Sequence, residues 1–221
     1  MSIKEKYKVK SIDNYQCKEW FLYKHYAKRM PPISYAFGLF DNENILHGVI
    51  SFGDCGGSTQ SHTLIEGYKI NELNRLCISE GLEKNILSFF VSQSLNLLPK
   101  PMAIISYADT TLGHHGYIYQ ATNWIYAGKT SKDVNLKKGT EILHRKSFYD
   151  KFGKSSKAEF IKQGYEIIES LEKHRYFMFL GNKKEVKDMK SKLTYPILPY
   201  PKGENKRYNS DYKPTVQIGL F

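Results

Sequence analysis

Acidic, aromatic and cationic side chains that can do chemistry gather within residues 72–128. Asp109 follows an apolar run of strand length, and Tyr119 follows the turn after it. Arg75 interrupts the apolar run LNRLCI, where burying an unpaired cation would cost on the order of several kcal/mol, so we expect Glu72, Asp109 or a phosphate as its partner. Such groups together can move protons and balance charge, which predicts a transfer site with Asp109 as general base.

A second group of candidates lies in the loop Ser79–Asn85. Gly81 permits a tight turn, and the loop leads into a helix whose first N–H groups and positive dipole end favour a phosphate. The candidate ligands for a donor are Ser79, Gly81, Lys84, Asn85 and Ser88. A single glycine beside a helix start is also common in ordinary connections, so the loop alone does not establish a site.

The elements that must position these groups form one continuous unit. Leu73–Ile78 and Met102–Tyr107 are apolar runs of strand length, and Ile86–Leu98 between them has helical periodicity that ends at prolines. A strand, helix and strand in one sheet predict a parallel, right-handed connection. A short helix then carries Tyr117 and Tyr119, and a helix offset of one residue would exchange which of them faces the site.

This order of elements, ending in IYQATNWIYAG, resembles the acyl-CoA-binding half of the GNAT acyltransferase fold. The resemblance implies that the loop before the long helix holds the pyrophosphate of coenzyme A, supplied as acetyl-CoA or another thioester. It also implies that Tyr119 protonates a departing thiolate or orients the donor.

Four runs resemble the phage Mom family of DNA-modifying proteins: ELNRLCISEGLEKN, SYADTTLGHHGYIYQATNWIYAG, KHRYFMFLGNKK and YPILPYPKGENKRY. That family converts adenine in DNA to a carbamoylmethyl form and so shields phage DNA from restriction enzymes. The resemblance implies a role in activity for His25 and Tyr26, and it supports a site role for Arg75. Without it, a packed Tyr26 and a surface His25 would be the simpler interpretation.

The remaining segments complete the fold prediction. Asp13 is expected to cap a helix that runs to about Met30, and Ile33–Phe40 with Ile45–Phe52 reads as a hairpin. Ser155 or Ser156 is expected to cap a short helix that Gly164 ends. Lys173–Leu180 is a further strand, and a helix capped by Asn182 follows it. We therefore expect an α/β, GNAT-like domain over residues 1–221. Its central sheet would be mixed, mostly antiparallel and flanked by helices, with a splayed parallel strand pair.

Charge and aromatic content indicate the partner. The chain of 221 residues has a net charge of +11, with 17 Tyr and 12 Phe, and this combination favours double-stranded DNA over a membrane. We expect a basic insertion at about residues 129–165 and an extended, proline-rich tail at about 193–221. The candidate nucleic-acid contacts are Lys138, Arg145, Lys146, Lys202, Lys206, Arg207 and Tyr208.

The three cysteines are scattered, which favours a reducing cytoplasm and argues against a disulfide framework. No apolar run reaches membrane-spanning length. A metal such as iron or zinc has only His25, Asp109 and His115 as a set to test, because adjacent histidines on a helix diverge.

These observations favour an enzyme that modifies adenine in DNA with a small-molecule donor, after the base is flipped onto an exposed tyrosine or Phe148. A thioester transfers its group through a carbonyl, whereas a carbamoylmethyl group is attached through a methylene, so the donor stays open. Two alternatives are an acetyl-CoA-dependent N-acyltransferase acting on a protein, RNA or small-molecule amine, and a non-catalytic DNA-binding protein.

Overall fold

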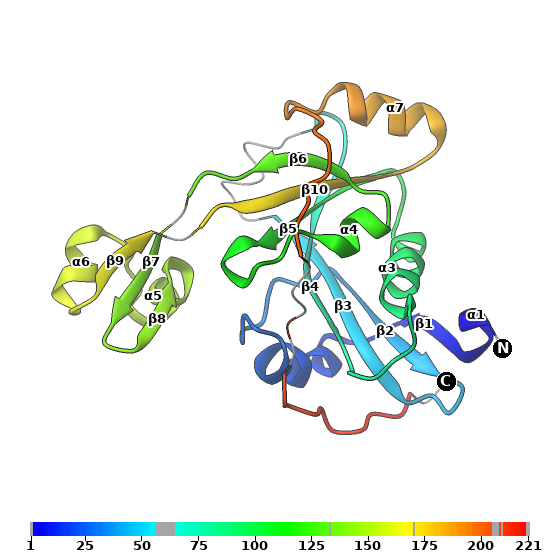
Figure 1. Ribbon diagram of the computed structural model, residues 1–221, viewed down its shortest axis with the longest axis horizontal. Helices are drawn as coiled ribbons and strands as arrows, with labels where there is room; N and C mark the ends of the chain where they lie inside the picture. Colours follow the sequence, from blue (N-terminus) through cyan, green and yellow to red (C-terminus); the bar gives the residue numbers. More distant parts are fainter. Residues whose placement is uncertain are drawn as a thin grey trace.

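A mixed main sheet forms the centre of the molecule in the computed structural model (Figure 1). The structure describes residues 2–55, 65–132, 134–169, 171–204, 208 and 210–219. The strands of the main sheet, in order across it, are β1 (Tyr7–Ser11), β2 (Tyr35–Asp41), β3 (Leu46–Asp54), β4 (Ile70–Ile78), β5 (Met102–Asp109), β10 (Lys173–Leu180) and β6 (Ile125–Lys129). Neighbouring strands are antiparallel except β4 and β5, so the predicted mixed α/β sheet with one parallel pair is confirmed.

Helices cover both faces of this sheet, because the apolar side chains of each strand alternate between two sides. The described helices that pack on it or flank it are α1 (Ile3–Lys6), η1 (Asn14–Cys17), η2 (Trp20–Lys24), α3 (Ile86–Leu97), η3 (Thr110–Leu112), α4 (Tyr117–Ala121) and α7 (Lys183–Ser191). The core under α3 and α4 includes Phe90 and Trp124. On the other face, η1 and η2 bury Trp20 and Phe21 at one side, and α7 buries Met189 at the other.

A small lobe, residues 134–169, projects from the main sheet on the extensions of β6 and β10 (Figure 1). It consists of β7 (Val134–Lys138), β8 (Glu141–His144), α5 (Arg145–Phe152), α6 (Lys157–Lys162) and β9 (Glu166–Glu169). The lobe has its own aromatic core, in which Phe148, Phe160 and Tyr165 are buried. Phe148 has no exposed surface, so the prediction that a flipped base could stack on it is wrong.

Two capping predictions are confirmed and one helix prediction is wrong. The side chain of Asn182 accepts hydrogen bonds at the start of α7, and Ser156 does the same at the start of α6. The helix expected from Asp13 to Met30 is instead two short helices, and the chain turns extended at His25. The reason is the π-helical geometry of η2, followed by a turn closed by the bond from Lys28 N–H to the His25 carbonyl.

The C-terminal segment is extended, as its prolines predict. The described residues of 198–219, which we call the strap, extend from β6 at one end to the β2–β3 hairpin at the other (Figure 1). At one end Leu198 N–H donates to the Tyr126 carbonyl, and at the other Ile218 forms a β-bridge with Ile45. Among the described helices, none has the length and apolar character needed to span a bilayer.

Candidate functional site

The site is built around the point where β4 and β5 separate. Their parallel pairing ends at Glu72 and Ile105. Beyond it, the strands are linked by a side chain: Ser106 Oγ lies 2.8 Å from the Leu73 carbonyl oxygen and 2.7 Å from the Tyr119 hydroxyl. Since a serine has one proton, Ser106 donates to the carbonyl and accepts from the phenol. The mouth of the fork, where the pairing has ended, is therefore bridged at its base by a hydroxyl pair.

A β-bulge in β4 decides which side chains face that mouth. Ser51 pairs with Arg75 and Phe52 with Leu73, which leaves Asn74 as the extra residue. As a result Leu73 and Leu76, three residues apart, both pack on the core under α3. Glu72 and Arg75 consequently share the opposite face, although a regular strand would put residues three apart on different faces. The bulge therefore brings a carboxylate and a guanidinium together.

The segment after η2 brings a histidine and a tyrosine to this same face. The His25 ring stacks on the Tyr26 ring with centroids 4.3 Å apart, and the His114 ring meets Tyr26 at 6.0 Å. His25 Nδ1 accepts from the Ala27 N–H at 3.0 Å, which fixes this short turn. Burial lowers the pKa of His25 to about 3, helped by the nearby charge of Arg75, so its ring is neutral.

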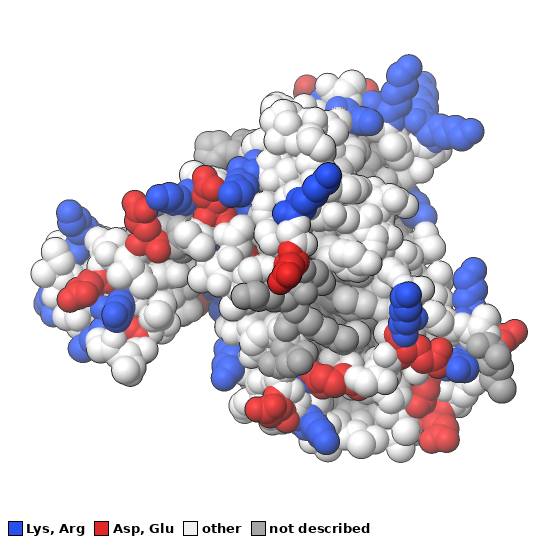
Figure 2. All heavy atoms as spheres, in the orientation of Figure 1, with Lys and Arg blue, Asp and Glu red and all other residues white. Residues whose placement is uncertain are grey.

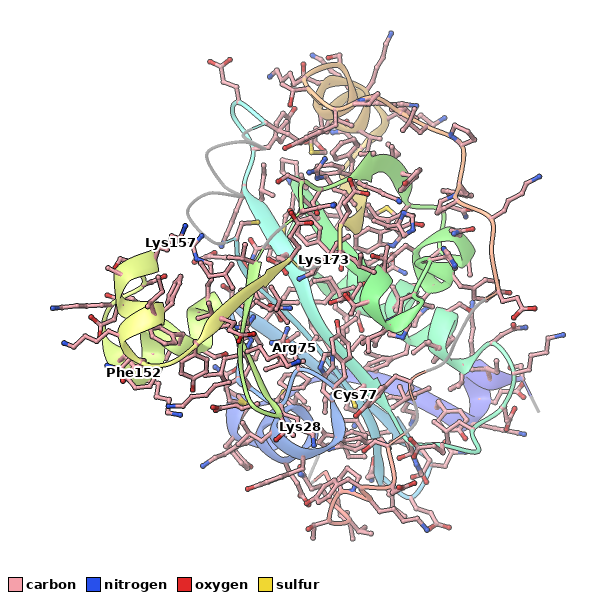
Figure 3. The ribbon with its side chains drawn as sticks, turned by 60° about the vertical axis from the view of Figure 1, so that its left-hand side comes forward. Lys28, Arg75, Cys77, Phe152, Lys157 and Lys173 are labelled. Carbon is pink, nitrogen blue, oxygen red and sulfur yellow. The ribbon has the colours of Figure 1, made fainter. Side chains whose placement is uncertain are left out.

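The charges around the fork are strongly coupled. Burial raises the pKa of the Glu72 carboxyl. The charges of Arg75, Lys173 and Lys146 lower this pKa, but they offset the effect of burial only in part. Figure 3 shows Arg75 on β4 between the turn that carries Lys28 and the end of β10 at Lys173. Burial lowers the pKa of Arg75, whose Nε is buried without a partner among the described residues. The cluster therefore holds one half-buried carboxylate with a raised pKa among several cations.

Asp109 and Tyr119 approach the fork from opposite faces of the sheet. Asp109 caps η3 through a 2.9 Å bond from the Thr111 N–H, and Lys173 Nζ lies 4.0 Å from its other oxygen. Tyr119 packs in the core under α3 and α4, and burial raises the pKa of its hydroxyl strongly. Tyr26 is the common neighbour: burial raises its pKa to about 12, and the charge of Asp109 adds to this shift. The charge of Tyr26 in turn contributes to the raised pKa of Tyr119.

The predicted donor loop contains two residues in left-handed conformation. Gly81 and Asn85 both have positive φ, +77° and +69°, and no atom lies within 4 Å of where a Gly81 side chain would begin. Asn85 caps α3 without using its side chain. Ser88 Oγ donates to the Asn85 carbonyl, while Lys84 is exposed. The Ser79 N–H donates to the His47 carbonyl, so this end of the loop is tied to β3.

A buried ion pair ties this loop to the His25–Tyr26 segment. Lys24 Nζ lies 2.5 Å and 2.6 Å from the two carboxylate oxygens of Glu80 and donates to the Tyr212 carbonyl of the strap at 3.3 Å. Only 2% of the Lys24 side chain is exposed. One ammonium thus connects the donor loop, the catalytic candidates and the strap.

The metal set suggested by the sequence is not assembled. The His115 ring lies 5.6 Å from the His174 ring, under Gly203 of the strap, whereas it is His114 that contacts Tyr26. In the described part of the chain, no group of three or more His, Cys, Asp or Glu side chains is arranged to hold a metal ion. His25, Asp109 and His115 therefore do not fit one ion as a set.

Comparison with known proteins adds the family to this geometry. The model of the Mom protein family matches residues 6–202. This chain belongs to the Mom family. The methylcarbamoylase mom of Escherichia phage Mu is 26% identical over 204 residues, which cover 81% of this chain and 77% of that relative. The family resemblance seen in the sequence is thereby confirmed, and the match includes the fork, the donor loop and His25–Tyr26.

The predicted nucleic-acid contacts of this Mom family member are spread over the lobe and the strap. Arg145 and Lys146 are exposed at the start of α5, and Lys146 is near enough to Glu72 to affect its pKa. Lys138 instead donates to the Gln163 carbonyl and lies over the Tyr165 ring, so it supports the lobe. Figure 2 shows cations on the lobe and on α7 at opposite ends of one face. Lys202 and Tyr208 are exposed on the strap, and Lys206 and Arg207 lie outside the described residues.

Sequence reasoning missed two residues of the fork. Glu72 was predicted only as one possible partner for Arg75. A regular strand would place residues 72 and 75 on opposite faces, so the pattern gave no sign that both belong to the site. Ser106 carries no motif at all. Its only signal is a hydroxyl inside the apolar run MAIISYA, which needs a hydrogen-bond partner once buried.

Proposed function

We propose that this chain modifies adenine in DNA by attaching a carbamoylmethyl group to the exocyclic amine, which would protect phage DNA from restriction. Membership of the Mom family and the name of the phage Mu relative, a methylcarbamoylase, support the reaction class. The net charge of +11 supports a polyanionic substrate. The observation that carries the proposal is the fork itself, where a half-buried carboxylate with a raised pKa, phenols and cations meet at the end of the parallel strand pairing.

The chain's own residues can supply what the reaction requires of a base. The lone pair of the exocyclic amine is delocalised into the adenine ring, so the amine must lose a proton as its new bond forms. Glu72 suits this role because burial raises its pKa and makes its carboxylate more basic. Arg75 on the same face would balance the charge that develops.

Asp109 is the alternative base. Its Oδ1 already accepts from the Thr111 N–H and its Oδ2 lies 4.0 Å from Lys173 Nζ, so both carboxylate oxygens are already engaged. We therefore assign Asp109 to holding the turn and the Tyr26 phenol. Tyr119, whose one hydroxyl proton is donated to Ser106, would orient the donor from the base of the fork rather than protonate a leaving group.

A coenzyme A thioester is the donor class that we propose for the loop around Gly81 and Asn85. The two positive φ angles fit the pyrophosphate of coenzyme A. The start of α3 fits it as well, because the Asn85 side chain makes no capping bond there. Such a donor would supply an activated acyl carbon, and a second substrate would still be needed for attachment through a methylene. Calorimetry that detects no coenzyme A binding would remove this donor from the proposal.

Mass spectrometry of nucleosides tests the function directly. DNA from cells that express the chain should contain an adenine nucleoside heavier by one carbamoylmethyl group. Glu72→Gln should abolish it, whereas Asp109→Asn, which keeps the capping oxygen, should reduce it without abolishing it. Both variants should keep wild-type affinity for DNA. An unmodified adenine pool in cells with the wild-type chain would refute the function, and loss of product in Asp109→Asn alone would reverse the assignment of the base.

A further inference from the structure

The strap passes directly over the face of the sheet that carries Glu72, Arg75 and Tyr26. Above the site, Gln120 Nε2 donates to the Pro201 carbonyl at 3.3 Å, and any side chain on Gly203 would collide with the His115 ring. Below it, Thr215 N–H donates to Glu19 at 2.8 Å. The strap is thus held on both sides of the site. Between these two points, Tyr208 contacts the site.

Tyr208 contacts the site through its ring. Its centroid lies 5.8 Å from that of Tyr26, at an interplanar angle of 65°. Tyr26 is in turn stacked on His25, which is buried, so one face of Tyr26 is already covered and held in place. Both tyrosines are partly open, with 36% of Tyr26 and 40% of Tyr208 exposed. Two accessible rings therefore meet beside the candidate base Glu72, whose charge affects the pKa of Tyr26.

We propose that Tyr208 and Tyr26 form the binding slot for the target nucleobase, which enters between their rings and stacks on both. This inference rests on the proposed function, because it names how the adenine of that reaction is held. The present contact between the two rings is edge-to-face, an arrangement that aromatic pairs prefer in the absence of a ligand. A flat base replaces it with two stacking contacts, and only the Tyr208 ring has to move, because Tyr26 is held by its stacking on His25.

The position of the slot explains why an aromatic pair is needed there. A base taken out of the duplex loses its stacking and pairing, and aromatic side chains restore part of that energy. Tyr26 brings the base next to Glu72 and Arg75, so its exocyclic amine comes close to the carboxylate. The family match ends at residue 202, so Tyr208 belongs to a part of this chain beyond the match.

Binding measurements without any donor test the slot. Two duplexes are compared, one with a single unpaired adenine and one with an abasic site at that position. The wild-type chain should prefer the adenine duplex by roughly tenfold, as expected for stacking of one base. Tyr208→Ala should lose most of this preference, and Tyr208→Phe should keep it.

Tyr15→Ala is the matched control, since Tyr15 is 73% exposed on η1. It should bind both duplexes like the wild type, and thermal unfolding should show that both alanine variants are folded. Equal affinity of the wild-type chain for the two duplexes, or an unchanged preference in Tyr208→Ala, would overturn the slot. Because no chemistry is involved, these outcomes are separate from nucleoside mass spectrometry, which tests the reaction.

Discussion

Removing the Ser106 hydroxyl should reveal how the fork is held together. Ser106 donates to the Leu73 carbonyl at 2.8 Å and accepts from the Tyr119 hydroxyl at 2.7 Å, and all of these groups are buried. Ser106→Ala breaks both bonds and leaves the phenol without its partner. Each lost bond costs about 1 kcal/mol, and a buried phenol left unpaired costs about 1–3 kcal/mol. We expect a loss of about 3 kcal/mol in the free energy of unfolding.

The partner variant should cost less. Tyr119→Phe removes one hydrogen bond but leaves Ser106 bonded to the Leu73 carbonyl, so we expect a loss of about 1 kcal/mol. In the double variant no phenol is left unpaired, so its loss should be smaller than the sum of the two single losses by about 1–2 kcal/mol. Urea unfolding of the four proteins measures these energies. Tyr119→Phe should also reduce adenine modification more than Ser106→Ala, which keeps the phenol.

A matched control exists inside α3. Ser94 is also fully buried, but its hydroxyl donates only to the Phe90 carbonyl one turn earlier, so Ser94→Ala should cost less than about 1 kcal/mol. Energies of Ser106→Ala and Tyr119→Phe that add within about 0.5 kcal/mol would refute the reasoning, because the two hydroxyls would then not depend on each other.

Three further outcomes follow from the charges. Burial raises the pKa of Glu72, so its contribution to stability is complete below the usual pKa of 4.5 and is lost as the pH rises through its pKa in the folded protein. Glu72→Gln should therefore raise the urea midpoint at about pH 8 but not at about pH 4. Burial lowers the pKa of His25 to about 3, so its contribution to stability should be complete above the usual pKa of 6.5 and should fall as the pH drops from 6.5 toward 3. His25→Asn should flatten this decline in unfolding curves recorded between these pH values. Side-chain exposure is 2% for Lys24 and 43% for Glu80. Glu80→Ala leaves the buried Lys24 ammonium without its carboxylate, so it should destabilise the protein by about 2–3 kcal/mol more than Lys24→Met. Equal losses of the free energy of unfolding in urea would contradict this.

Local sequence signals were enough for much of the scaffold. The apolar run, helix and apolar run that became β4, α3 and β5 predicted a parallel pair, and the pairing of Glu72 with Ile105 confirms it. The caps at Ser156 and Asn182 were also predictable, because a cap depends on residues only two or three positions apart. Periodicity failed before His25, where a π-helical turn and a left-handed Lys28 end what the sequence presents as one helix.

The composition of the site was decided by contacts between distant segments. A one-residue bulge at Asn74 reverses strand alternation and places Glu72 beside Arg75, and it arises from the register between β3 and β4. Phe148 became core because the lobe folds its own sheet around it. Tyr208 meets Tyr26 although the two residues lie near opposite ends of the chain. The sequence by itself determined which residues were available and which short elements they form. Only the tertiary structure determined which of them meet, because strand register and the path of an extended segment depend on partners far away in the chain.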